Sequence, residues 1–151
     1  MKKIRIYLDT CCYNRPFDDQ TDEKIHIETE AIITIFRMKD ENKVKIIGSE
    51  IIDYETENII DTGKKMKVSN IIEIADEKVY INDDMEERAK YLESLGFKGF
   101  DALHIAASEN GKADFFVSTD IKLLKLAGIK KHELTVKTLN PIELIEEMIY
   151  G

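Results

Sequence analysis

Strand-like and helix-like patterns alternate along almost the whole chain, and this alternation most constrains its fold. Short apolar runs typical of strands occur at 3–8, 44–48, 79–81, 114–117 and 135–139. Helical spacing of apolar residues, or helix start and stop signals, predict helices at about 22–38, 49–59, 65–75, 84–95, 101–110, 121–126 and from 141 onward. Strands alternating with helices predict an α/β fold, with a parallel sheet covered on both faces.

Three of the expected helices carry local predictions that a structure can test. The helix at 22–38 should bury one apolar face, formed by Ile25, Ile32, Ile33 and Phe36. The last helix should open with Asn140 as N-cap, Pro141 in the first position and Glu143 in a capping box. Gly96 is expected just beyond the helix at 84–95, since glycine commonly follows a helix end.

The sequence predicts one ordinary globular domain that spans residues 1–151. It is 43% hydrophobic and 34% charged, and no linker, repeat or low-complexity stretch divides it. No apolar run approaches the ~20 residues needed to span a bilayer. The first residues reach a charged position before a signal-peptide core could form. We therefore expect a cytoplasmic protein without membrane contacts.

The charge balance and the cysteines narrow the possible functions. The net charge of −8 opposes simple electrostatic capture of nucleic acid, which normally needs a basic excess. It fits a cluster of carboxylates that awaits cations, or a protein with a basic partner. Cys11 and Cys12 are adjacent, which disfavours a disulfide between them, and the chain has no zinc-like cysteine spacing.

Four acidic residues occupy positions where a parallel sheet would bring them together. Asp9 follows the first strand and Asp120 the fourth, while Glu55 and Asp101 lie in the first turns of two helices. Ligands of such sheets bind outside the carboxyl ends of the strands, where these segments begin. Oxygen ligands without histidine or cysteine favour Mg²⁺ or Mn²⁺.

Each acid also has a purely structural interpretation. Asp101 and Asp120 could be helix caps, and Glu55 could be a solvated charge among other acids. Asp9 is harder to explain in this way. A carboxylate that ends a buried strand is costly unless it is paired or binds a ligand.

The residues around these acids resemble the motifs of a known family. YLDT at 7–10, SEIIDYE at 49–55, FDALHIAAS at 100–108 and VSTD at 117–120 are similar to the four acidic motifs of PIN-domain ribonucleases, which include VapC-like toxins. The resemblance implies a three-layer α/β/α sandwich and Mg²⁺- or Mn²⁺-dependent endonucleolytic cleavage of RNA. It maps the metal ligands onto Asp9, Glu55, Asp101 and Asp120. Glu50 and Asp53 compete with Glu55 for the second position.

The same resemblance implies partners. A VapC-like toxin would have an antitoxin protein, and dimerisation is common in the family, so we expect RNA as substrate, a possible antitoxin and a possible homodimer. Weaker substrate-contact candidates flank the acids. Thr10 and Thr119 could orient a ligand or phosphate, with turn and cap hydrogen bonds as the alternative, and Lys98 and Lys122 flank the expected rim.

The segment after the first strand leaves two interpretations open. Arg15 could contact a substrate phosphate while Asn14 orients it, or Arg15 could stabilise its own loop by pairing with Asp18 or Asp19. His104 lies three residues after Asp101 on the same helix face, where we expect packing beside the site rather than catalysis.

Other chemistries fit the sequence less well. A haloacid-dehalogenase phosphatase needs a second acid two residues after the first, but Cys11 stands there. A cysteine phosphatase needs an arginine six residues after its cysteine, and neither cysteine has one. No phosphate-binding glycine motif occurs. The remaining alternative is a non-catalytic PIN-like module that binds nucleic acid or protein, although the presence of all four acids argues against it.

Overall fold

The computed structural model describes residues 2–151, whose strands form one all-parallel sheet in the order β3-β2-β1-β4-β5. These strands are β1 (Ile4–Leu8), β2 (Val44–Ser49), β3 (Glu77–Val79), β4 (Phe115–Val117) and β5 (Lys137–Leu139). The central strand β1 pairs on both sides, with Ile6 opposite Ile46 of β2 and Phe115 of β4. The α/β class and the parallel sheet predicted from the sequence are thus confirmed.

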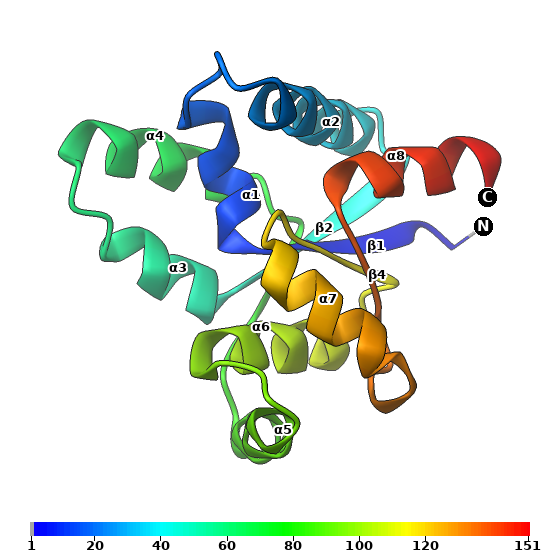
Figure 1. Ribbon diagram of the computed structural model, residues 1–151. Coiled ribbons are helices and arrows are strands. Elements are labelled where there is room, and N and C mark those ends of the chain that lie inside the picture. Colours follow the sequence, from blue (N-terminus) through cyan, green and yellow to red (C-terminus); the bar gives the residue numbers. More distant parts are fainter. Residues whose placement is uncertain (1) are drawn as a thin grey trace.

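Helices cover both faces of this sheet and surround the carboxyl ends of its strands (Figure 1). The helices are α1 (Thr10–Asn14), α2 (Glu23–Asp40), α3 (Glu50–Glu57), α4 (Thr62–Ile72), α5 (Asp83–Ser94), α6 (Gly99–Asn110), α7 (Ile121–Ile129) and α8 (Pro141–Tyr150), with short 3-10 turns η1 (Arg15–Phe17) and η2 (Lys131–Glu133). In Figure 1, α2 and α8 lie on one side of the sheet, and α6 and α5 on the other. This is a three-layer α/β/α sandwich. None of the helices in residues 2–151 combines the length and apolarity that crossing a bilayer demands.

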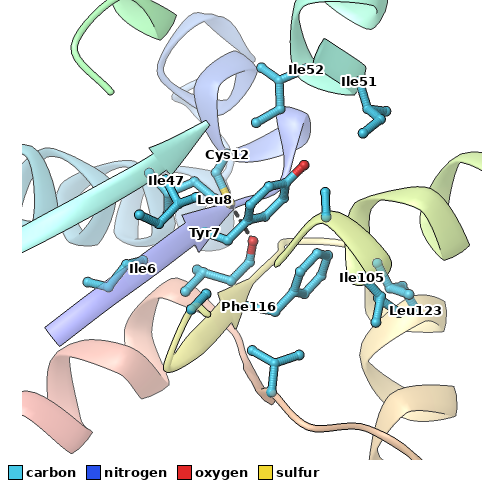
Figure 2. Packing of buried hydrophobic residues seen from close by; sticks show 14 of the residues in the cluster. Ile6, Tyr7, Leu8, Cys12, Ile47, Ile51, Ile52, Ile105, Phe116 and Leu123 are labelled. Atoms are coloured by element: carbon cyan, nitrogen blue, oxygen red, sulfur yellow. Dashed lines mark hydrogen bonds between the residues drawn. The ribbon is translucent and has the colours of Figure 1, made fainter. Parts of the chain in front are cut away.

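The core that carries the site consists of the two central strands and the helices packed on them. Ile6, Tyr7 and Leu8 of β1 have almost no exposed surface, as do Ile46 and Ile47 of β2. Near-continuous apolar runs of this kind are expected where a parallel strand is covered on both faces. The rings of Tyr7 and Phe116 stack with centroids 5.6 Å apart, as Figure 2 shows. Residues that directly follow β1 and β4 are therefore anchored in the buried core.

Several predicted helix ends are confirmed. Asn140 and Glu143 form the reciprocal capping box at the start of α8, with Pro141 in the first turn. Gly96 has a φ of +111°, a conformation that other residues rarely adopt. Ser49, the first residue of the helix expected at 49–59, caps α3 through its side chain, which accepts a hydrogen bond from the Ile52 amide.

Other boundaries differ from the sequence-based expectation. The third strand lies at Glu77–Val79 rather than 79–81, and the helix expected at 65–75 is α4, Thr62–Ile72. The segment after β1, expected to be a loop, forms α1 and η1. Asp101 does not cap α6, because the helix begins at Gly99 and Lys98 holds the cap position without a side-chain bond.

The expected apolar face of α2 is partly wrong. Ile32 is fully buried, but Ile33 is 50% exposed, and the acidic Glu28 has no exposed surface at all. The Glu28 carboxylate lies 3.0 Å from Nη2 of Arg15 and accepts a 2.6 Å hydrogen bond from Nδ2 of Asn140. These partners offset the cost of burying a charge, so α2 docks through an ion pair as well as through apolar residues.

Candidate functional site

All four predicted acids line one cavity of about 320 Å³ at the carboxyl edge of the sheet. Four separate elements deliver them: Asp9 follows β1, Glu55 lies in α3, Asp101 lies in the first turn of α6, and Asp120 precedes α7. The remaining lining residues are Thr10, Cys11 and Asn14. The topology therefore brings these distant carboxylates together, as the position of the strand ends suggested.

Asp9 is the most deeply buried of the four acids, with 7% of its surface exposed. Its Oδ2 atom accepts a 2.9 Å hydrogen bond from the hydroxyl of Ser118 and lies 3.5 Å from the thiol of Cys11. Its Oδ1 atom lies 3.5 Å from Nε2 of His104. A buried carboxylate needs such partners, and these leave Oδ1 on the side of the histidine and the cavity.

Glu55 is held by two groups. The hydroxyl of Thr10 donates a 2.7 Å hydrogen bond to its Oε1 atom, and Nε2 of His104 hydrogen-bonds the same oxygen. Burial would raise the pKa of Glu55, but these hydrogen bonds and the charge of His104 outweigh it, so the pKa lies below its usual 4.5. Glu55 is therefore ionised and fixed in orientation at neutral pH.

His104 is a central residue of the site that the sequence analysis treated as packing. It is 1% exposed, and its Nδ1 atom lies 2.6 Å from the hydroxyl of Tyr7, which in turn lies 2.7 Å from Oγ of Ser49. Burial opposes its charged form, but the nearby carboxylates of Asp9 and Glu55 outweigh burial and raise its pKa above the usual 6.5. The one available signal was its position three residues after Asp101.

Asp101 and Asp120 complete the acidic rim. Burial, together with the negative charges of Asp9 and Asp120, raises the pKa of Asp101 to about 6. Asp120 is exposed, and its Oδ1 atom accepts a 3.1 Å hydrogen bond from the Leu123 amide, so it also caps α7. A carboxylate has a second oxygen, which makes the capping role compatible with a role at the cavity.

The donor set fits a divalent cation. Ligand atoms of Asp9, Glu55 and His104 all lie within 4.8 Å of one another. The raised pKa of Asp101 results first from burial and then from repulsion by Asp9 and Asp120, and a bound cation would relieve that repulsion. Carboxylate oxygens suit both Mg²⁺ and Mn²⁺, and the imidazole of His104 could join them only as a neutral ring whose Nε2 is released from Glu55.

The weaker candidates for substrate contacts divide into two groups. Asn14 lines the cavity and donates a 2.9 Å hydrogen bond to the carbonyl of Thr10, whose own side chain binds Glu55. Thr119 is buried, and Lys98 and Lys122 are exposed; none of these three lines the cavity. Lys98 is still close enough to Asp101 for its positive charge to lower the pKa of that acid slightly.

Arg15 and the two acids that competed with Glu55 are engaged elsewhere. Arg15 forms ion pairs with Asp18 at 3.1 Å and with Glu28 at 3.0 Å, which is the loop-stabilising arrangement. Glu50 accepts a 2.8 Å hydrogen bond from the Ile81 amide. Asp53 pairs with Lys78 at 2.5 Å, beside a larger cavity of about 640 Å³ that contains none of the four acids.

Comparison with known proteins supports the fold. Neither a protein-family model nor a curated protein sequence matches the chain. Among solved structures, a chain in the crystal structure of VapBC2 from Rickettsia felis, bound to a DNA fragment from their promoter, is similar to it with a TM-score of 0.57. The two share 15% sequence identity over 91% of this chain and 98% of that one. The chain therefore shares its overall fold with a chain of that complex.

Proposed function

We propose that this protein is an endoribonuclease that uses Mg²⁺ or Mn²⁺ to hydrolyse phosphodiester bonds. One observation carries the proposal: Asp9, Glu55, Asp101 and Asp120 come from four separate elements and line the same cavity. A VapC-like fold together with a carboxylate cluster able to hold a metal supports a nuclease. The specific choice of RNA rests on the resemblance of the four acidic motifs to PIN-domain ribonucleases.

In this proposal the acids bind the cation and the surrounding residues orient them. A bound divalent cation supplies activation of the attacking water and stabilises charge on the phosphate and the leaving oxygen. Asp9 and Asp101 are the central ligands. Glu55, held by Thr10 and His104, and Asp120, fixed as the cap of α7, complete the set.

Substrate contacts come from the rim of the cavity. Asn14 lines it directly, and Lys98 lies next to Asp101, so both can reach a phosphate bound there. Thr119 directly precedes Asp120, Lys122 follows it by two residues, and both are weaker candidates. We assign Arg15 to the loop rather than to the substrate, because its guanidinium is engaged by Asp18 and Glu28.

We further propose a role as the toxin of a toxin–antitoxin pair, with a cytoplasmic location. The similar solved structure is a VapBC complex, and the net charge of −8 suits a partner with a basic segment. The alternative function is a non-catalytic module that binds nucleic acid or protein through the same fold. A homodimer is compatible with either function.

RNA cleavage assays distinguish the two functions. The protein should cleave single-stranded RNA with Mg²⁺ or Mn²⁺, and EDTA should stop cleavage. Asp9→Asn and Asp101→Asn should each reduce the rate by orders of magnitude, whereas Asp84→Asn, at an exposed acid of α5, should not. Equal cleavage by wild type, both variants and EDTA-treated protein would contradict the nuclease proposal, and RNA binding without cleavage would favour the non-catalytic module.

A further inference from the structure

Two exposed aromatic side chains stack on each other across α3 and α6, the helices that also carry Glu55 and Asp101. The rings of Tyr54 in α3 and Phe100 in α6 have centroids 5.7 Å apart and planes inclined by 28°. Tyr54 is 58% exposed and Phe100 is 47% exposed, so the pair belongs to the surface rather than to the core. We call Tyr54 and Phe100 the aromatic pair.

The aromatic pair is connected to the cavity through both of its helices. Tyr54 directly precedes Glu55, and Phe100 directly precedes Asp101. Because both acids line the cavity, the backbones that carry the two rings also carry its walls on α3 and α6. A chain bound with one phosphate at the acids therefore has the aromatic pair within the reach of a neighbouring nucleotide.

The charge of the protein argues that such a surface is needed. With a net charge of −8, the protein gains little from the general attraction to phosphates on which most nucleic-acid-binding proteins rely. Two lysines differ in their availability for a phosphate. Lys78 is paired with Asp53, which precedes Tyr54 in the sequence, whereas Lys98 is exposed and lies near Asp101. Affinity must then come largely from contacts that do not depend on net charge, and stacking of bases on aromatic rings is such a contact.

We propose that the aromatic pair is a stacking platform for an unpaired base of the substrate, which restricts the substrate to single-stranded nucleic acid. The inference rests on the proposed nuclease function, whose cavity sets the position of the phosphate. Bases in a duplex are stacked and paired with each other, so their faces are closed to the rings. A base in a single strand presents its face and can cover the exposed surface of Tyr54 or Phe100.

Two other occupants of the aromatic pair are conceivable and would act differently. A second copy of the chain, or the apolar face of a protein partner, would cover the rings without any dependence on bases. The position of the pair on the same two helices as Glu55 and Asp101 favours the nucleic acid. Measurements that isolate the base from the backbone therefore test the proposal directly.

The test compares two probes of equal length, with Ca²⁺ in place of Mg²⁺ or Mn²⁺, so that the acids hold a cation while binding is measured without cleavage. One probe is a single-stranded oligonucleotide, and the other is the same sugar–phosphate chain without bases. Wild-type protein should bind the base-bearing probe more tightly by about tenfold, and Tyr54→Ala or Phe100→Ala should remove most of that preference. Tyr54→Phe and Phe100→Tyr should retain it, and so should Tyr150→Ala, which removes an 86% exposed ring at the end of α8.

A spectroscopic measurement places the base on the ring. The chain contains no tryptophan, so Phe100→Trp introduces a single tryptophan at the proposed platform, which can be excited selectively over the tyrosines. Its fluorescence should be quenched by the single strand but not by the matching duplex. Unchanged base preference in both alanine variants overturns the platform. An alanine variant that keeps the base preference but sediments differently from wild type overturns it too, because the rings would then contact a second copy of the chain. If wild-type protein never cleaves RNA but the alanine variants still lose the base preference, the nuclease function is contradicted and the platform is retained.

Discussion

The Nδ1 atom of His104 lies 2.6 Å from the hydroxyl of Tyr7, in a region where neither side chain is exposed by more than 1%. This contact links the core strand β1 to the helix that carries Asp101, and it fixes the ring whose other nitrogen meets Glu55. The orientation of one acid of the site therefore depends on a hydroxyl in the hydrophobic core. Removing that hydroxyl should be felt both in stability and at the cavity.

Tyr7→Phe should lower the free energy of unfolding by about 1–3 kcal/mol, because it leaves a buried imidazole nitrogen without its partner. Urea denaturation measures the loss. Tyr13→Phe is the matched control, since the hydroxyl of Tyr13 is buried without a hydrogen-bond partner. The control should be neutral or slightly stabilising, and equal losses in the two variants would contradict the role of the Tyr7–His104 contact.

Asp101→Asn should stabilise the metal-free protein at neutral pH. In the folded state the pKa of Asp101 is raised from 3.8 to about 6, so its stabilising effect is complete below the unfolded value and is lost as the pH rises through 6. Between pH 4 and pH 7, the free energy of unfolding of the variant should rise relative to that of wild type by about 1–3 kcal/mol, when unfolding is measured in EDTA. A difference that is the same at both pH values would rule out the explanation by burial and charge repulsion.

Divalent metal should raise the melting temperature of wild-type protein. An ion that binds only the folded state stabilises it by about 2.7 kcal/mol at a concentration of one hundred times its Kd. Asp9→Asn and Glu55→Gln should lose most of this effect in a thermal scan with Mn²⁺, whereas Glu50→Gln should keep it, because Glu50 does not line the cavity. A shift of equal size in all four proteins would place the ion elsewhere.

Arg15→Met should be strongly destabilising, by about 3–5 kcal/mol, because it leaves the fully buried carboxylate of Glu28 without its positive partner. The double variant Arg15→Met, Glu28→Met should recover a large part of the loss. Chemical denaturation of the two single variants and the double variant gives the coupling directly. Normal stability with a large loss of RNA cleavage in Arg15→Met would instead assign Arg15 to the substrate.

Gly111→Ala should destabilise the fold, whereas Gly128→Ala should not. A Cβ atom at Gly111 would lie 2.8 Å from Cγ2 of Val79 and 2.9 Å from Cγ2 of Ile47, and such overpacking typically costs about 1–3 kcal/mol. At Gly128, inside α7, a Cβ atom meets nothing within 4 Å, and replacing a helical glycine gains about 0.5–1 kcal/mol. Melting temperatures of the two variants should therefore move in opposite directions.

The sequence was sufficient to predict the convergence of the four acids because that prediction depends on topology alone. Asp9 and Asp120 follow β1 and β4, which are neighbours in the sheet, and parallel neighbours end at the same edge. The capping box of Asn140 and Glu143 was equally accessible, since it is a local pattern within four residues. The capping box is encoded at short range, whereas the order of the strands was not predicted; the convergence needed only the rule that ligands of a parallel sheet bind at the carboxyl ends of its strands.

The parts that the sequence analysis missed depend on contacts across the molecule. The helix α1 has five residues, too few to show a helical period. The hydrogen bond of His104 to Glu55 depends on how α6 lies against α3, which no spacing reveals. Glu28 was hidden for the same reason: its burial requires Arg15 and Asn140, of which Asn140 is 112 residues away.

The strand order β3-β2-β1-β4-β5 has a consequence for the newly made protein. Asp9 leaves the ribosome early, but β4, which lies beside β1 and is followed by Asp120, is made only after Asp101 and all of α6. A partly synthesised chain thus carries the first acids without the last ones. The complete set of four acids can therefore form only after Asp120 has been synthesised.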